Sequence, residues 1–335
     1  MDALPDFSLL RPRTLDELMR ARAENSASSL LGGGTDLIVN IRRGIVAPPV
    51  LIDVNDVSEL RGIKADADAF EIGAAATLAD LAAHAEVARH YPVVAQAAAH
   101  IAGPTHRNMG TVGGNLALDT RCIYYNQSEW WRAANNHCLK TTGEICHVAP
   151  KSRGVCFATF SGDLAPALLT LDAEIDIAGP AGRRTIPLAD LYIGYARQDE
   201  PVTETRGDGK YFLSLRRGEI ITAVRARNTP GLRSAYDKIR IRRSIEYPVT
   251  GVAVALRRDG EKLANLRRLH RHQSAPGAAR RHRRTLRRRT GCARLRRARR
   301  AGARPDHGDE DDIHPRSLPP PRRRCFGTAL GAALV

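Results

Sequence analysis

Four cysteines lie close together in the sequence and could bind a metal. Cys122, Cys138, Cys146 and Cys156 fall within 35 residues, in the loop-like spacing C-x15-C-x7-C-x9-C. We expect a cytoplasmic protein, because the chain shows neither an apolar run long enough for a membrane span nor an N-terminal secretory signal. Thiols stay reduced in the cytoplasm, so a metal or an iron-sulfur cluster explains this set better than disulfides do.

Two glycine-rich motifs precede the cysteines and could bind a phosphate group. Gly32-Gly33-Gly34-Thr35-Asp36 follows an apolar segment, and Gly110-Thr111-Val112-Gly113-Gly114-Asn115 lies farther along. Glycines let backbone N–H groups approach an anion closely. A single such run is more often a tight turn, and the first motif lacks both the Walker lysine and the G-x-G-x-x-G spacing. Two runs far apart in sequence predict one extended dinucleotide held between them.

Alternating strands and helices must position these motifs. Thr14-Leu15-Asp16-Glu17 is a capping-box pattern that predicts a helix, and apolar spacing predicts further helices over 78–89, 93–101 and 164–171. Apolar runs predict strands over 29–31, 50–54, 70–74, 156–160, 174–177, 218–224 and 249–256. A return strand should follow the Asp259-Gly260 turn and pair with residues 249–256, but the alternation stops from about Leu266, so the domain is expected to lack its ending.

Most of the positive charge lies in the C-terminal tail. Residues 267–335 contain 20 arginines, no lysine and five acidic residues, which gives a net charge of 20 − 5 = +15. The whole chain has a formal net charge of +16. The first 266 residues are almost neutral and give no basic footprint for nucleic acid. The tail composition is typical of a GC-rich gene translated in a shifted reading frame, and a nucleic-acid-binding arm is the alternative. An unstructured tail would leave the strand before Asp259 with an unpaired edge.

The motifs resemble the FAD-binding subunits of the molybdenum hydroxylases, the family of xanthine dehydrogenase and carbon monoxide dehydrogenase. The resemblance covers about residues 5–262 and rests on four segments: 30–37, 107–115, 162–167 and 236–243. It implies an α+β fold of the vanillyl-alcohol-oxidase/PCMH type with several α/β subdomains. It also implies FAD contacts from Leu30, Leu31, Gly32, Gly33, Gly34, Thr35, Asp36, Gly110, Thr111, Val112, Gly113, Gly114, Asn115, Asp163 and Lys238.

The resemblance also assigns roles within the FAD site. Asp163 is expected on the adenosine side of FAD and Lys238 near the flavin ring, with Ile220 or Ile221 packed on the ring. The arginines of the 240–243 run are equally consistent with a solvated face, a subunit contact or a cofactor contact. The expected subdomains are 1–58, 59–180 with an insertion at 116–160, an incomplete 181–265, and the aberrant tail 266–335.

The cysteines lie in the insertion, which separates Asn115 from Asp163 by 47 residues. Such an insertion resembles that of the β subunits of 4-hydroxybenzoyl-CoA reductases, which implies a [4Fe-4S] cluster on the four thiolates beside FAD. The metal stays open, because structural zinc and four unligated thiols are alternatives. His137 and His147 are expected beside the metal rather than bound to it, and Trp130 and Trp131 are expected to pack the insertion against the flavin domain.

Three functions from different classes remain. The first is the electron-transfer subunit of a reductase, in which reduced ferredoxin supplies electrons through the cluster and FAD to partner subunits that carry [2Fe-2S] clusters and a molybdenum cofactor. That assembly, a dimer of heterotrimers, would reduce 4-hydroxybenzoyl-CoA to benzoyl-CoA. The second is the FAD subunit of a hydroxylating molybdenum dehydrogenase with a structural metal loop. The third is a basic nucleic-acid-binding protein built around the tail. We expect neither a membrane nor a nucleic-acid partner for the first two, and no catalytic residue can be assigned on this chain.

Overall fold

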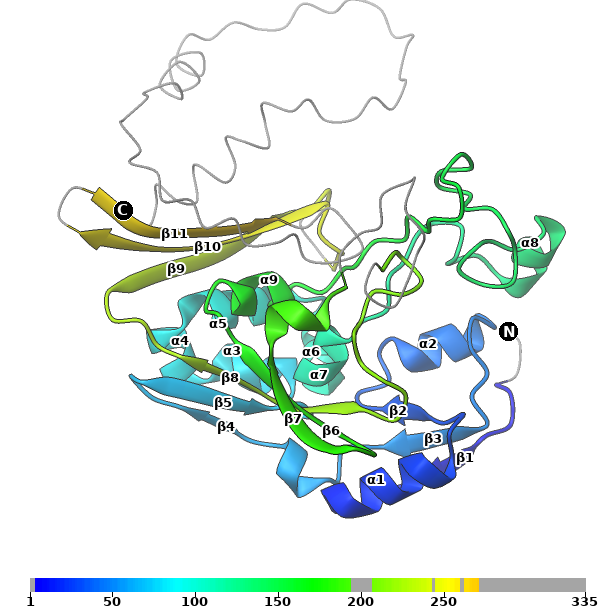
Figure 1. Cartoon of the computed structure of the whole chain (residues 1–335), viewed down its shortest axis with the longest axis horizontal. Coiled ribbons are helices and arrows are strands. Elements are labelled where there is room, and N and C mark those ends of the chain that lie inside the picture. Colours follow the sequence, from blue (N-terminus) through cyan, green and yellow to red (C-terminus); the bar gives the residue numbers. More distant parts are fainter. Residues whose placement is uncertain (1–3, 194–206, 243–244, 260–261, 271–335) are drawn as a thin grey trace, which may run out of the picture.

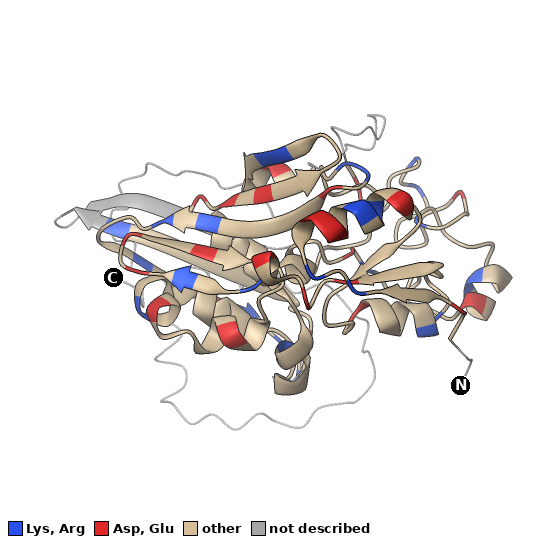
Figure 2. Ribbon diagram, turned by 90° about the horizontal axis from the view of Figure 1, so that it is seen from below, with Lys and Arg blue, Asp and Glu red and all other residues tan. Residues whose placement is uncertain are grey.

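The computed structural model describes residues 4–193, 207–242, 245–259 and 262–270. Most of the arginine-rich tail lies outside these residues, so the frame-shift and nucleic-acid hypotheses are not tested by the fold. Basic and acidic residues are interspersed along the described elements (Figure 2). None of the helices in the described part of the chain has both the length and the apolar character that a membrane span needs.

A three-stranded parallel sheet carries the first glycine motif. Its order is β1 (Ser8–Leu10), β3 (Val50–Asp53), β2 (Ser29–Leu31), and α1 (Leu15–Glu24) and α2 (Leu37–Arg42) connect the strands. The predicted helix start is confirmed, because the Thr14 hydroxyl accepts a hydrogen bond from the Glu17 N–H at 3.2 Å. The Glu17 carboxylate accepts the Arg13 N–H at 2.7 Å, one residue earlier than a capping box predicts.

Two further sheets enclose a layer of helices (Figure 1). The five-stranded antiparallel sheet has the order β4-β5-β8-β6-β7, and the three-stranded antiparallel sheet has the order β11-β10-β9. The strands are β4 (Ile63–Ala65), β5 (Ala69–Gly73), β6 (Glu174–Gly179), β7 (Gly182–Pro187), β8 (Ile220–Arg227), β9 (Leu232–Ile239), β10 (Thr250–Asp259) and β11 (Lys262–His270). The helices are α3 (Leu78–Ala83), α4 (Ala85–His90), α5 (Pro92–His100), α6 (Pro104–Met109), α7 (Val112–Leu116), α8 (Glu129–Ala134) and α9 (Leu164–Leu169), of which α8 lies apart in the insertion.

The core follows from this layering. α5 packs on α9 and on β9, and α7 packs on β5 and β8, so one large apolar cluster joins the helix layer to both antiparallel sheets. A second cluster joins α1 and β3 to Ala75, Ala178 and Ile220. The parallel sheet is therefore packed against the five-stranded sheet, and the α+β class is confirmed.

Two predicted elements are wrong, and the last strand is longer than the sequence indicated. The helix expected over 78–89 breaks at His84, whose ψ of 115° is extended and whose ring accepts the Val87 N–H at 3.4 Å to begin α4. Residues 156–160 form no strand in this described segment, only an isolated bridge between Thr159 and Arg121. β11 does form and pairs with β10, with Leu266 opposite Leu256. β10 therefore has a partner on each side and no unpaired edge.

Candidate functional site

The two glycine motifs lie in contact. A Cβ built on Gly33 would lie 1.8 Å from the carbonyl oxygen of Met109, and one built on Gly32 would lie 3.0 Å from the Thr111 hydroxyl. The chain can approach the Met109 backbone this closely only because Gly33 carries no side chain. The structure thus brings the two glycine motifs together, although almost 80 positions separate them in the sequence.

Neighbouring elements fix the second motif. The Thr111 hydroxyl accepts the Gly114 N–H at 3.2 Å and caps α7, while the Leu78 N–H donates to the Gly110 carbonyl at 2.9 Å. The side-chain oxygen of Asn115 accepts the Leu164 N–H at 3.2 Å. This bond joins the second motif to the start of α9, so the long insertion leaves and rejoins the fold at one place.

A cavity of about 630 Å³ opens between the motifs. That volume falls in the range usual for small-molecule and cofactor sites. Twelve of the predicted FAD contacts line it: Leu30, Gly32, Gly33, Gly34, Thr35, Asp36, Gly110, Thr111, Gly113, Gly114, Asn115 and Asp163. Ile220 and Ile221 also line it, as expected for residues that pack on a flavin. Leu31, Val112 and Lys238 are not among the lining residues.

Asp163 and Lys238 form a buried ion pair at the cavity wall. The Lys238 ammonium lies 2.9 Å from the Asp163 carboxylate, and the Tyr236 hydroxyl donates to the other carboxylate oxygen at 2.5 Å. Lys238 also donates to the carbonyl of Glu246, which lines the cavity. The expected roles, with Asp163 on the adenosine side of FAD and Lys238 near the flavin ring, remain predictions. Through its bond to the Glu246 carbonyl, Lys238 also fixes the loop that leads into β10.

The sequence did not indicate several other cavity residues. Arg121 lines the cavity, and its Nη2 donates to Asp36 at 3.1 Å. Ile245, Glu246 and Tyr247 come from the loop between β9 and β10. The exposed Arg242 guanidinium lies 2.9 Å from Glu246 and holds the pKa of that carboxyl below its usual range. Of the remaining arginines in this run, Arg243 lies outside the described residues.

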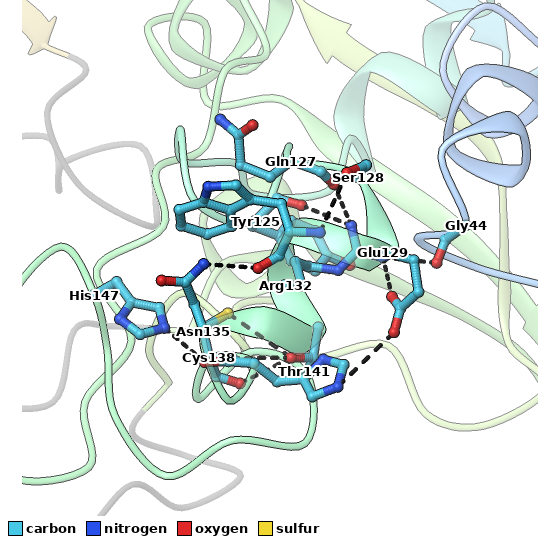
Figure 3. A network of polar contacts seen from close by, with 12 residues as sticks. Gly44, Tyr125, Gln127, Ser128, Glu129, Arg132, Asn135, Cys138, Thr141 and His147 are labelled. Carbon is cyan, nitrogen blue, oxygen red and sulfur yellow. Dashed lines mark hydrogen bonds and ion pairs between the residues drawn. The ribbon is translucent and has the colours of Figure 1, made fainter.

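A buried arginine holds the insertion against the N-terminal part of the fold. Arg132 is only 2% exposed, and its Nη2 donates to the Gly44 carbonyl at 2.8 Å and to the Glu129 carboxylate at 2.5 Å (Figure 3). The prediction that Trp130 packs the insertion against the flavin domain is wrong, because Trp130 is 80% exposed. Trp131 packs within the insertion, with its ring 6.1 Å from that of Tyr124.

All four cysteines of the insertion are free thiols. Cys138, Cys146 and Cys156 are buried and Cys122 is half-buried. The Tyr125 N–H donates to the Cys122 sulfur at 3.3 Å, and the Phe157 N–H donates to the Cys146 sulfur at 3.4 Å. Backbone donors of this kind are common around sulfur ligands of iron-sulfur clusters.

The thiols also influence one another. The Cys156 thiol donates to Cys146 and lowers the pKa of Cys146, while the same bond and burial raise the pKa of Cys156. Burial first, and then the charges of Cys138 and Cys146 among smaller causes, raise the pKa of Cys122. All four thiols therefore belong to one neighbourhood. In the part of the chain that is described, however, no three His, Cys, Asp or Glu side chains are arranged to hold a metal ion.

The two histidines lie beside the thiols. The His147 ring contacts the His137 carbonyl at 2.6 Å and packs on Tyr124, while the His137 ring lies 3.8 Å from Glu129. Both rings are engaged with other groups.

Comparison with known proteins identifies the family. Residues 5–226 match the family described as the FAD binding domain in molybdopterin dehydrogenase. The chain belongs to this family. The aldehyde oxidoreductase FAD-binding subunit PaoB of Escherichia coli K12 is 32% identical over 259 residues, which span 76% of this chain and 78% of that protein. The carbon monoxide dehydrogenase medium chain of Hydrogenophaga pseudoflava is 27% identical over 266 residues, 78% of this chain and 73% of its own.

Solved structures of the family confirm the fold. A chain of carbon monoxide dehydrogenase from Hydrogenophaga pseudoflava superposes with a TM-score of 0.62 at 24% identity, covering 84% of this chain and 78% of that one. Quinoline 2-oxidoreductase from Pseudomonas putida 86 gives a TM-score of 0.60 at 23% identity, with the same coverage. The expected PCMH-type FAD-binding fold is therefore confirmed. The family match and the curated relatives identify the chain as a flavoprotein subunit of an oxidoreductase.

The cavity fits FAD on its own chemistry. Gly32, Gly33, Gly113 and Gly114 present backbone without side chains along one wall, which suits a pyrophosphate. Apolar side chains such as Ile220 and Ile221 supply a surface for an aromatic ring.

Proposed function

We propose that this chain is the FAD-binding electron-transfer subunit of a molybdenum-containing oxidoreductase of the xanthine or carbon monoxide dehydrogenase type. Its partners would be a molybdenum-cofactor subunit and a [2Fe-2S] subunit in a hetero-oligomer. The observation that carries the proposal is the contact between the two glycine motifs at one cavity of about 630 Å³. Membership of the FAD-binding family supports it.

The residues of this chain bind and orient the cofactor in this proposal. When bound, FAD accepts two electrons and can release them one at a time. The glycine motifs allow close approach to its pyrophosphate, and the Asp163–Lys238 pair holds the wall of the cavity in place. No side chain here is assigned to proton transfer, so the substrate would react on the molybdenum subunit.

A second candidate is favoured by the free thiols. It is the β subunit of a 4-hydroxybenzoyl-CoA reductase, with a [4Fe-4S] cluster on Cys122, Cys138, Cys146 and Cys156 and with reduced ferredoxin as donor. Four free thiols in one neighbourhood, two of which accept backbone N–H groups, support it. The described thiols do not form a site for a single ion.

Anaerobic purification of the natural assembly tests both candidates. About one FAD per chain, with co-purifying molybdenum and [2Fe-2S] subunits, is expected from the first. About four additional irons and matching acid-labile sulfide are expected from the second. Cys146→Ala should then lose those irons and keep FAD, while Cys292→Ala, outside the insertion, should keep both. Normal FAD without the extra iron would reject the second candidate alone, and absence of flavin would reject both.

A further inference from the structure

Arg121 lines the cavity, and two of its guanidinium nitrogens lack an acceptor among the described residues. Its side chain is only 10% exposed, and among the described residues nothing accepts a hydrogen bond from Nε or Nη1. Only Nη2 is engaged, with Asp36 at 3.1 Å. A guanidinium keeps its charge in any protein, and a buried donor without an acceptor is destabilising. The cavity therefore presents a charged donor that lacks its acceptor.

The fold holds this guanidinium in place. Its Cζ lies 5.2 Å from the centre of the Tyr125 ring, and its backbone exchanges two 2.9 Å hydrogen bonds with Thr159 at the base of the insertion. Asp119 does not supply the missing acceptor. Lys140 binds Asp119 at 2.8 Å, whereas the nearest Arg121 nitrogen, Nη2, lies 3.9 Å from it.

The charges around the cavity point to an anion. Two of its lining carboxylates already have cationic partners elsewhere, since Asp163 pairs with Lys238 and Glu219 pairs with Arg184. Arg121 is thus a buried cation whose free donors remain for a ligand. FAD offers two kinds of anionic oxygen, on the pyrophosphate and on the ring of the reduced flavin.

We propose that the Arg121 guanidinium binds an anionic oxygen of FAD through Nε and Nη1. This inference rests on the proposed function, because it requires FAD in the cavity. A hydrogen bond from a charged donor is worth enough that its loss should weaken binding of the oxygen by about 10- to 100-fold. Arg121→Lys keeps the charge but loses the planar pair of donors.

The test compares Arg121→Lys and Arg121→Gln with wild type, all as full-length protein stripped of flavin. Calorimetry gives the Kd of FAD and of ADP, which carries the pyrophosphate without the flavin, and reductive titration gives the flavin midpoint potential. Thermal unfolding shows whether each variant is folded. Arg225→Gln is the matched control, because Arg225 pairs with Glu71 and Asp176 on the five-stranded sheet and does not line the cavity.

Each result supports or overturns the assignment. Parallel loss of affinity for FAD and ADP in both variants, with Arg225→Gln unchanged, indicates a pyrophosphate oxygen. Unchanged ADP binding with a midpoint potential lowered by about 30 mV, the equivalent of a tenfold loss for a two-electron couple, indicates the reduced flavin ring. Unchanged affinities and potential in a folded variant would overturn the inference. A wild-type protein that binds no FAD would overturn the proposed function itself.

Discussion

The contact between the glycine motifs makes Gly33→Ala a severe change. The new Cβ would lie 1.8 Å from the Met109 carbonyl oxygen and 2.8 Å from the Gly110 nitrogen, both backbone atoms that no rotamer change can move. The closest ordinary C···O contacts are about 3.3 Å, so the loops must separate by about 1.5 Å. Overpacking of this kind costs about 1–3 kcal/mol of stability. Because this separation moves backbone N–H donors away from the pyrophosphate, FAD binding should weaken by at least about 100-fold.

Gly32→Ala is the matched control for this prediction. Its Cβ would meet the Thr111 side chain at 3.0 Å, and that side chain can move by a few tenths of an ångström. Fluorescence titration with FAD and thermal unfolding of both variants measure the two effects. We expect Gly33→Ala to lose far more affinity and stability than Gly32→Ala. Equal FAD affinity in Gly33→Ala and wild type would show that the close approach of the loops is not needed for binding.

Three other predictions concern the surroundings of the cavity. Lys238→Met leaves the buried Asp163 carboxylate without its cation and should lower the free energy of unfolding by about 3–5 kcal/mol in urea titration; a loss below about 1 kcal/mol would contradict the burial of the pair. Arg132→Gln should speed proteolysis within residues 122–156, whereas Trp130→Ala should not, since its ring is exposed. The hydrogen bond from Arg184 lowers the pKa of Glu219 in the folded protein. Ionised Glu219 therefore stabilises the fold at any pH above the pKa that it has in the unfolded chain. This stabilisation is lost as the pH falls through the lower pKa of the folded state. The unfolding free energy of Glu219→Gln should accordingly depend less on pH in acid than that of wild type.

The glycine motifs were predictable because their chemistry lies in the backbone. Gly33 and Gly113 act by lacking a side chain, and that property is visible in a sequence. Strand β3 was predictable from its apolar run, and β5 was predictable from apolar residues at alternate positions. The break at His84 was not, because a histidine ring that caps a helix gives no periodic signal.

Contacts between distant parts of the chain were the features that the sequence could not show. Arg121 faces Asp36 across 85 positions, and Arg132 docks the insertion on a backbone carbonyl at Gly44, to which any residue type could contribute. The aromatic pair at 130–131 suggested packing, yet a short helix with a buried arginine took that role. Composition indicated the end of the domain too early, because β11 runs to His270 through an arginine-rich stretch.

The identity of the cofactor in the cavity tests the proposed function most directly. Acid extraction of the natural assembly, followed by chromatographic identification of the released flavin, measures it. We predict FAD at about one per chain, as the cavity between the two glycine motifs requires for a dinucleotide. Release of FMN in place of FAD, or of no flavin from the intact assembly, would contradict it.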